Sequence, residues 1–413
     1  MSGSSSDHDI FRSRSVGANP LPGSPFEILL VFLRLGVTCF GGPIAHLGYF
    51  RAEFVERRKW LSERAYVDLV AISQFLPGPA SSQTGFGIGL MRGGLLGGLA
   101  AWTGFTVPSA LLMVLFAYGA GSLADSPAGA GVLHGLKLVA VAIVAQAVMG
   151  MARSLCPDRV RASIATVALL VILVSQRSSL QIGVIIFGGL AGWLLCRGEG
   201  GVTNDGFAMP VSRRVGTFCL VAFFAVLALA FVPVAAGPLA LFDAFYRSGA
   251  LVFGGGHVVL PLLRNAVVVP GWVSDSSFLA GYGAAQAVPG PLFTFSAYLG
   301  AVVGIGPGGI PGSVIAVVAI FLPGILCLLG VLPFWRGLRA RPGAQAVMRG
   351  TNAAVVGLLG AAFYDPVWTS AVLDGKDFAV AAAGFVLLVV WNAPPLLVVF
   401  LSALAGAGMG LVG

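Results

Sequence analysis

Charged residues are scarce in this chain. Only 10% of its 413 residues are Asp, Glu, Lys or Arg, whereas 57% are hydrophobic, and the mean hydropathy is +0.93. A soluble domain of this size needs far more charge on its surface, so the composition predicts an all-α polytopic membrane protein. The net charge of +8 comes from basic residues in short loops between apolar segments. This distribution is typical of the positive-inside rule and argues against a nucleic-acid partner.

Several kinds of functional site are also missing from the sequence. The five cysteines are far apart and form no CxxC or Cys/His cluster, which argues against a disulfide framework, a metal site or a redox pair. Walker, HExxH and GxSxG motifs are absent, and no GxGxxG follows a strand, so we expect neither an enzyme nor a bound cofactor. Residues 1–25 have no apolar run like that of a secretory signal, and we predict a disordered tail there.

The chain contains a duplicated unit. Phe40, Gly41 and Gly42 recur 213 residues later, and the pattern Gln-x-x-Pro-Gly-Pro that starts at Gln74 recurs 212 residues later, at Gln286. Two offsets that agree within one residue indicate an internal duplication. We predict a first repeat over 26–196, a cytoplasmic linker with one connecting transmembrane helix over 197–238, and a second repeat over 239–413.

The Gly/Pro motifs interrupt the transmembrane segments. The clear helical runs are residues 95–121, 131–152, 162–176, 180–196, 215–235, 309–335, 350–364, 377–392 and 395–412. By contrast, residues 26–40 supply only about 22 Å of helix before the first break, too little to cross the roughly 30 Å hydrocarbon core.

Charge counting favours re-entrant or broken hairpins at these motifs, with the N-terminus in the cytoplasm. Hairpins keep the basic cluster at 51–64 on the cytoplasmic side with most other arginines, whereas full spans would move it outside. The extra helix at 215–235 makes the second unit enter from the opposite face, so we predict inverted-topology repeats.

The breaks are also the candidate substrate site. A proline after glycine suits the start of a helix, so new half-helices are expected at Pro43, Pro79 and Pro291 and near Gly256. Their free N–H groups carry partial positive charge and can bind an anion, with nearby hydroxyls as further donors. The alternative is an ordinary Gly/Pro kink that packs against neighbouring helices. The candidate substrate-binding residues at the breaks are Gly41, Gly42, Pro43, His46, Gln74, Pro77, Gly78, Pro79, Ser81, Ser82, Thr84, Gly254, Gly255, Gly256, His257, Gln286, Pro289, Gly290, Pro291 and Thr294.

Two arginines complete the candidate set. Arg34 and Arg247 each lie six residues before Phe-Gly-Gly, inside an apolar segment. Each guanidinium either binds an oxyanion with its planar fork, or reaches the interface or pairs with Glu27 or Asp243. The same two possibilities, substrate contact or structural bond, remain open for Gln74, Gln286 and His46.

The motifs resemble those of the chromate ion transporter (CHR) family in its long two-domain form. The resemblance covers residues 26–413 and rests on FLRLGVTCFGGPIAHLGYF and ISQFLPGPASSQTGFGIG in the first half and FGGGHVVLPLL and AQAVPGPLFTFSAYLG in the second. It implies a bacterial cytoplasmic-membrane protein that exports chromate, with sulfate as a chemical mimic. The family motifs implicate Arg34, Gly41, Gly42, Pro43, His46, Gln74, Pro77, Gly78, Pro79, Gly254, Gly255, Gly256, Pro289, Gly290 and Pro291.

The halves differ at two matched positions, since Gly256 stands opposite Pro43 and Val259 opposite His46, so we expect unequal contributions. With the cell interior negative, moving a dianion outward is favourable by about 4.6 kcal/mol per 100 mV.

We therefore predict a secondary transporter that exports chromate, driven by the membrane potential, a proton gradient or both. Its expected partners are chromate, the lipid bilayer and, through mimicry, sulfate, and a homodimer is left open. The alternatives are a sulfate or other oxyanion permease and, from another class, a membrane-bound chromate reductase, which would need a flavin or metal site.

Overall fold

The computed structural model describes residues 23–40, 42–175, 180–196, 211–232, 234, 236–253, 256–339 and 341–412. Residues 1–22 of the predicted tail and residues 197–210 of the predicted linker region, together with Gly41, Gly254 and Gly255, lie outside these residues. Every regular element in the described part of the chain is helical. Ser24 caps the first helix, which begins at Pro25, so the helical part starts just inside the predicted tail.

Within the described ranges, four helical stretches are long and apolar enough to cross a membrane: residues 80–120, 127–155, 309–334 and 342–371. Shorter apolar helices accompany them, and many large apolar side chains are exposed on the outer surface. The prediction of an all-helical polytopic membrane protein is therefore confirmed.

The helices follow one another in two similar series. The first comprises α1 (Pro25–Thr38), α2 (Gly42–Phe50) with a π-helical continuation (Arg51–Arg57), α3 (Glu63–Phe75), α4 (Ala80–Ala124), α5 (Pro127–Leu155), α6 (Arg159–Ser175) and α7 (Leu180–Leu195). After α8 (Arg213–Leu229), the second comprises α9 (Pro238–Ala250), η2 (Gly256–Val258), α10 (Val259–Leu263), η3 (Arg264–Val268), α11 (Asp275–Ala287), η4 (Leu292–Thr294), α12 (Phe295–Val302), α13 (Gly309–Val331), α14 (Trp335–Arg339), α15 (Pro342–Ala362), α16 (Thr369–Ala371), α17 (Gly375–Val389) and α18 (Pro395–Val412).

The two largest differences from the predicted helix limits are in α8 and α15. Helix α8 ends at Leu229 rather than near 235, and α15 begins at Pro342 rather than 350. In α15 the polar residues before 350 hide the first two turns from a hydropathy criterion, although Pro342 is well placed to start a helix.

The Gly/Pro breaks of the first series are tips of hairpins whose ends return to one face. Gly23, just before α1, donates its N–H to the carbonyl of Arg92 at 3.0 Å. Glu27 in the first turn of α1 lies 3.8 Å from Arg58, after the π-helical segment, and 3.9 Å from Arg92. Helix α4 reverses direction at Gly93 and Gly94, where the backbone is not helical. We call this end of the molecule the first face.

Charge pairs hold the first face together. Glu53 accepts hydrogen bonds from Arg57 at 2.9 Å and Arg58 at 2.6 Å, and Arg51 pairs with Glu63 at 2.8 Å. Burial raises the pKa of the Glu53 carboxyl, but the bonds from Arg58 and Arg57 outweigh burial and hold this pKa below its ordinary value.

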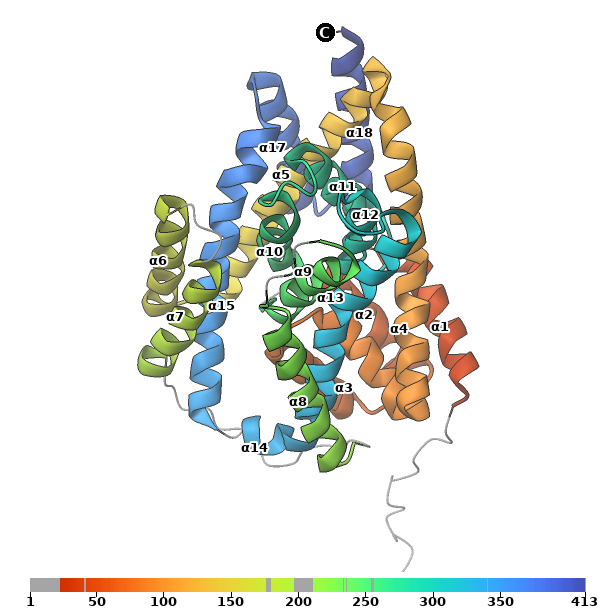
Figure 1. Cartoon of the computed structure of the whole chain (residues 1–413), viewed down its shortest axis with the longest axis vertical. Helices are drawn as coiled ribbons and strands as arrows, with labels where there is room; N and C mark the ends of the chain where they lie inside the picture. The colour runs from red at the N-terminus through yellow and green to blue at the C-terminus, as the bar shows by residue number, and fades with distance from the viewer. Residues whose placement is uncertain are drawn as a thin grey trace, which may run out of the picture.

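The hairpins of the second series end at the opposite end of the molecule, the second face. There Arg264 pairs with Asp275 at 2.9 Å, and Gly304 donates its N–H to the carbonyl of Trp272 at 3.0 Å. The far end of α4 reaches this face, because the Tyr118 hydroxyl lies against Gly309 at the start of α13. In Figure 1, α1 to α3 accordingly lie in the lower half and α10 to α12 in the upper half. The part of α4 that follows Gly94 extends from the lower half to the upper half.

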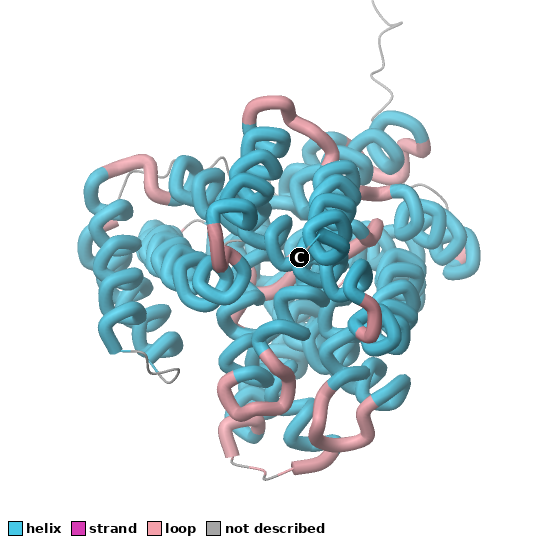
Figure 2. The backbone as a smooth tube through the Cα atoms, turned by 90° about the horizontal axis from the view of Figure 1, so that it is seen from above, coloured by secondary structure: helices cyan, strands magenta, loops and turns pink. Residues whose placement is uncertain are grey.

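Small residues let the helices pack closely around this centre. Gly131 and Gly135 of α5 meet Gly406 of α18, while Gly192 of α7 meets Gly350 of α15. Close backbone approach of this kind is the usual way in which membrane helices associate. Helices α6 and α7 pack on the outer side of α15 around a small hydrophobic cluster of their own. Figure 2 shows the molecule from above as a bundle of helices joined by short loops.

Candidate functional site: the junction of the four hairpin tips

Two reciprocal hydrogen bonds join the tips of the two series. Gly78, in the first Pro-Gly-Pro, donates its N–H to the carbonyl of Val252 at 2.8 Å. Gly290, in the second, donates to the carbonyl of Cys39 at 2.9 Å. Val252 and Cys39 directly precede the Phe-Gly-Gly motif of their own halves, so each Pro-Gly-Pro is bound to the other half. We call these four residues the tip junction.

The two glycines of the tip junction have backbones that favour glycine. Their φ angles are +115° at Gly78 and +96° at Gly290, in the left-handed region where a side chain is strained. A Cβ atom on Gly78 would lie 3.0 Å from the Cα of Gly324 in α13, and one on Gly290 would lie 2.9 Å from the hydroxyl of Ser109 in α4. Each Pro-Gly-Pro is thus seated on the long helix of the opposite half, next to a proline of that helix.

Gln83 ties the first tip to α13. Its amide Nε2 donates to the carbonyls of Pro77 and Gly324, both at 2.9 Å, and its side chain is buried. Sequence reasoning missed this residue. Its position four residues after Pro79, in the first turn of the new helix, was the available signal.

New helices begin at all four breaks. Helix α4 starts at Ala80 and η4 at Leu292, each one residue later than predicted, because the preceding proline has extended backbone angles and acts as the N-cap. No side chain caps either start, so the first N–H groups are left without a capping bond. Helix α2 begins at Gly42, one residue before the predicted Pro43, and η2 begins at Gly256 as predicted.

Several polar groups beside the tips are buried without a partner in the described part of the chain. They include the hydroxyls of Ser73, Ser82 and Ser296 and the Oε1 atom of Gln83. Native proteins rarely leave buried polar atoms unpaired, so each of these groups calls for an explanation. Each of the three hydroxyls has an O–H that can donate to an acceptor such as an anion.

Other predicted site residues have protein partners. The Nδ1 atom of His46 lies 3.4 Å from the hydroxyl of Ser81, whereas its Nε2 atom is buried without a partner in the described part of the chain. Thr84 and Thr294 donate their hydroxyls to backbone carbonyls one turn earlier, both at 2.8 Å. These threonines are therefore satisfied within their own helices.

The second half contributes a separate polar pair. His257 Nδ1 lies 2.7 Å from the hydroxyl of Tyr282, and Gln286, one turn further along α11, has an Nε2 atom that is buried without a partner among the described residues. Its counterpart in the first half, Gln74, is exposed. The two glutamines thus have different surroundings, in line with unequal contributions of the halves.

Neither predicted arginine reaches the tips. Arg34 is exposed on the outer face of α1, beside Leu30, Leu33 and Val37. Arg247 lies over the ring of Phe231 at 5.6 Å, and its Nε atom donates to the carbonyl of Asp243 at 3.4 Å. Both contacts of Arg247 are therefore local, one within α9 and one to the segment before it.

Both halves of the chain match a family of known proteins. The sequence pattern of the family described as "Chromate transporter" matches residues 26–193 and 239–407. The chain belongs to the chromate transporter family. Both matched segments contain one Phe-Gly-Gly and one Pro-Gly-Pro, the two motifs that meet at the tip junction.

Three relatives named for chromate transport resemble the chain over most of its length. The chain is 30% identical to the chromate transport protein of Pseudomonas aeruginosa, over 94% of this chain and 93% of the relative. It is 28% identical to a probable chromate transport protein of Synechococcus elongatus, over 81% and 83%, respectively. It is 25% identical to the chromate transport protein of Cupriavidus metallidurans, over 81% and 80%. No solved structure matches this member of the family.

Proposed function

We propose that this chain is a secondary transporter that exports chromate by binding the tetrahedral dianion at the tip junction. The observation that carries the proposal is the reciprocal pair of bonds from Gly78 to Val252 and from Gly290 to Cys39. Through this pair, both halves contribute to one central site. The names of the relatives support chromate as the substrate.

The local chemistry suits a multiply charged oxyanion. The uncapped start of α4 presents N–H groups and the positive end of a helix dipole. The buried Ser82 hydroxyl lies in the same first turn and has no partner within the described residues. Backbone and hydroxyl donors can surround a tetrahedral anion without a buried positive side chain, which would be costly here.

The arrangement of the hairpins supports alternating access. The tips meet at the centre, whereas the two sets of hairpin ends lie at opposite faces, so the halves are related as inverted repeats. A relative movement of the halves can open the same site first to one face and then to the other. We infer that the first face, which carries the arginine cluster and the start of α1, is cytoplasmic in a bacterial inner membrane.

The membrane potential supplies a driving force for export. An inside-negative potential favours outward movement of a dianion by about 4.6 kcal/mol per 100 mV, without a coupled cation. Such export would confer chromate resistance. A proton gradient would add to the driving force only if a proton moved inward with each cycle.

Competition in inside-out vesicles tests the substrate and the reaction class. Labelled chromate should accumulate intact, with its absorption spectrum unchanged, and excess sulfate should compete if the site reads tetrahedral shape and charge. Loss of the chromate spectrum on addition of purified protein would indicate reduction and contradict a transporter. Labelled sulfate entering faster than chromate would instead favour the sulfate permease.

A further inference from the structure

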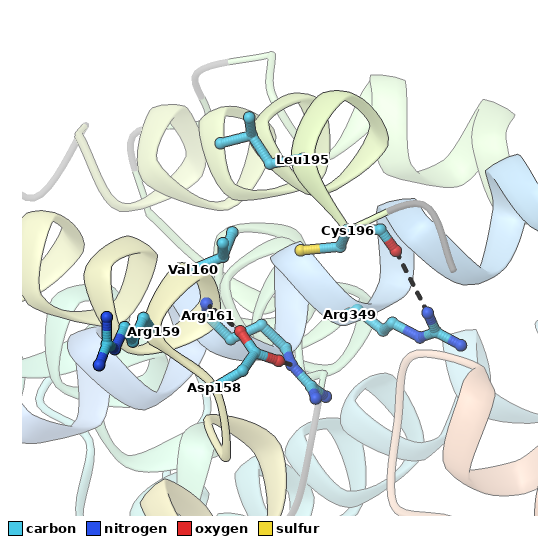
Figure 3. Close-up of a pocket in the computed structure, with 7 residues that line it drawn as sticks. All are labelled: Asp158, Arg159, Val160, Arg161, Leu195, Cys196 and Arg349. Atoms are coloured by element: carbon cyan, nitrogen blue, oxygen red, sulfur yellow. Dashed lines mark hydrogen bonds and ion pairs between the residues drawn. The ribbon is translucent and has the colours of Figure 1, made fainter. Parts of the chain in front are cut away.

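A basic pocket lies far from the tips, on the first face. Its volume is about 480 Å³, and it lies between the α5–α6 connection, the end of α7 and the start of α15. Its lining residues are Asp158, Arg159, Val160, Arg161, Leu195, Cys196 and Arg349. Figure 3 shows Asp158 paired with Arg161 of α6, Arg159 on the other side of Asp158, and Arg349 of α15 extending away from this pair to reach the Cys196 carbonyl.

The pocket has an excess of positive charge. Asp158 accepts bonds from the backbone N–H and Nε of Arg161, at 2.9 and 2.6 Å, so these two charges compensate each other. Among the described residues, Arg349 donates only to neutral acceptors, the Cys196 carbonyl at 3.2 Å and the Gln345 amide oxygen at 3.4 Å. Three arginines and one aspartate leave a formal charge of +2. An anion is therefore the ligand that this pocket favours.

The rim of the pocket is apolar and faces outward. Val160 is 38% exposed and Leu195 is 63% exposed, and the outer side of α7 continues with Leu194 and Leu190, both strongly exposed. In a membrane these side chains contact acyl chains. A ligand with a phosphate head and apolar tails fits both parts of the pocket.

The position of the pocket argues against the transported anion as its ligand. Helices α6 and α7 pack on the outer side of α15 around Ala168, Val184 and Ala354, a cluster separate from the main core. The tip junction lies in the main core, with Cys39 and Val252 both buried there. An anion in the pocket thus sits on the periphery of the molecule.

We propose that this pocket holds the phosphate of an anionic phospholipid, with Arg349 as the principal donor. Arginine forks recognise phosphate well, and basic pockets between membrane helices on the side of positive loops suit anionic headgroups. The phosphate would bridge α15 to the α5–α6 connection, with its acyl chains along Val160 and Leu195. The bound lipid would fasten α6 and α7 to α15, which also contacts η2 and α10 of the second half.

The test is lipid binding by the purified full-length protein in detergent. Phosphatidylglycerol and phosphatidylcholine with identical acyl chains are titrated, and the thermal unfolding midpoint and the number of retained lipids by native mass spectrometry are recorded. We expect phosphatidylglycerol to raise the midpoint of the wild type, and Arg349→Gln to weaken its binding at least tenfold. Arg213→Gln removes another exposed arginine of the same face and should bind as the wild type does.

Three outcomes would overturn the proposal. One is equal stabilisation by phosphatidylcholine, and another is unchanged phosphatidylglycerol binding in Arg349→Gln. The third is stabilisation by inorganic phosphate as large as that by the lipid, which would identify a free-anion site. If Arg349→Gln fails to fold, Arg349→Lys keeps the charge without the fork, and wild-type phosphatidylglycerol affinity in that variant would contradict the role assigned to the guanidinium.

Discussion

A single hydroxyl distinguishes substrate binding from helix packing at the tips. Ser82 is buried, and its Oγ has no hydrogen-bond partner in the described part of the protein. Removing it should leave stability unchanged but take one bond from a charged ligand, a loss of about 1.5–3 kcal/mol. We expect Ser82→Ala to weaken chromate binding by about 10- to 100-fold.

Calorimetric titration of chromate, together with the unfolding midpoint, measures both effects. Ser154→Ala, at an exposed hydroxyl that bonds the Gly150 carbonyl, is the matched control and should bind normally. Wild-type affinity in Ser82→Ala would exclude this hydroxyl from the site.

Gln83 should matter for stability. Gln83→Leu removes two bonds at 2.9 Å and leaves two buried carbonyls unpaired, so we expect a loss of about 2–4 kcal/mol. Gln146→Leu removes one longer bond, to the Leu388 carbonyl at 3.3 Å, and should cost about 1 kcal/mol. Denaturant unfolding in detergent compares the two. Equal losses would show that Gln83 does not hold the tip on α13.

At the residue scale, the sequence predicts the motif residues but not all their contacts. Gly78 and Gly290 were predicted because Gly/Pro breaks recur at a fixed offset. Their partners, the Cys39 and Val252 carbonyls, carry no side-chain signal, since any residue supplies a backbone oxygen. Arg34 was a candidate because charge is costly in an apolar segment, but periodicity within α1 places it with Leu30 and Leu33 on the outer stripe.

At the scale of elements, the opposed hairpins predict from which side of the membrane each hairpin end can be labelled. Arg57 and Ser276 are both exposed, and they lie beside the hairpin ends of the first and the second series, respectively. With the five native cysteines replaced, Arg57→Cys should react with a membrane-impermeant thiol reagent only in inside-out vesicles. Ser276→Cys should react only in intact cells. Labelling of both positions from the same side would contradict the opposed entry of the two hairpin pairs.

Glu53 belongs to the ionic cluster that joins α1 to the hairpin ends, and it should make the stability of the protein depend on pH in acid. The pKa of Glu53 in the folded protein is held below the ordinary pKa of a glutamate. The ionised carboxylate therefore stabilises the fold fully at pH values above the ordinary pKa, and this stabilisation is lost as the pH falls through the depressed pKa. Glu53→Gln should therefore lower the unfolding midpoint at neutral pH, and the difference from wild type should shrink below about pH 4. A difference that persists unchanged into strong acid would show that charge is not the cause.

Helix limits show which elements a sequence can specify. Apolar runs and prolines predict α5, α13 and α18 closely, because length and composition decide a membrane helix. The reversal of α4 at Gly93 and Gly94 is what the predicted hairpin requires before the span that begins at 95, although the six-residue segment Gly-Gly-Leu-Leu-Gly-Gly taken alone equally suits close packing in a straight helix. Contact between Gly89 and Gly97 across the reversal decides between the two.

At the scale of the whole molecule, the sequence shows that a unit is duplicated, but it does not show which tip of one half binds which tip of the other. Repeat offsets predict two units, and charge counts predict how each is oriented in the membrane. Which tip binds which depends on contacts more than 170 residues apart, such as Gly78 to Val252. One sequence without its fold contains no direct signal for such a pairing. These bonds join the two halves although their matched residues at 46 and 259 differ.

The most direct test of the central claim is potential-driven transport through the intact tip junction. The initial rate of labelled chromate uptake is measured in inside-out vesicles with an imposed interior-positive potential. We predict stimulation by the potential in the wild type and in Gly150→Ala, where an added methyl group meets open space. In Gly78→Ala/Gly290→Ala, which strains both left-handed tips, uptake should fall to the background of vesicles without the protein, although the variant is inserted in normal amounts. Uptake at the wild-type rate in that double variant would contradict a substrate site at the tip junction.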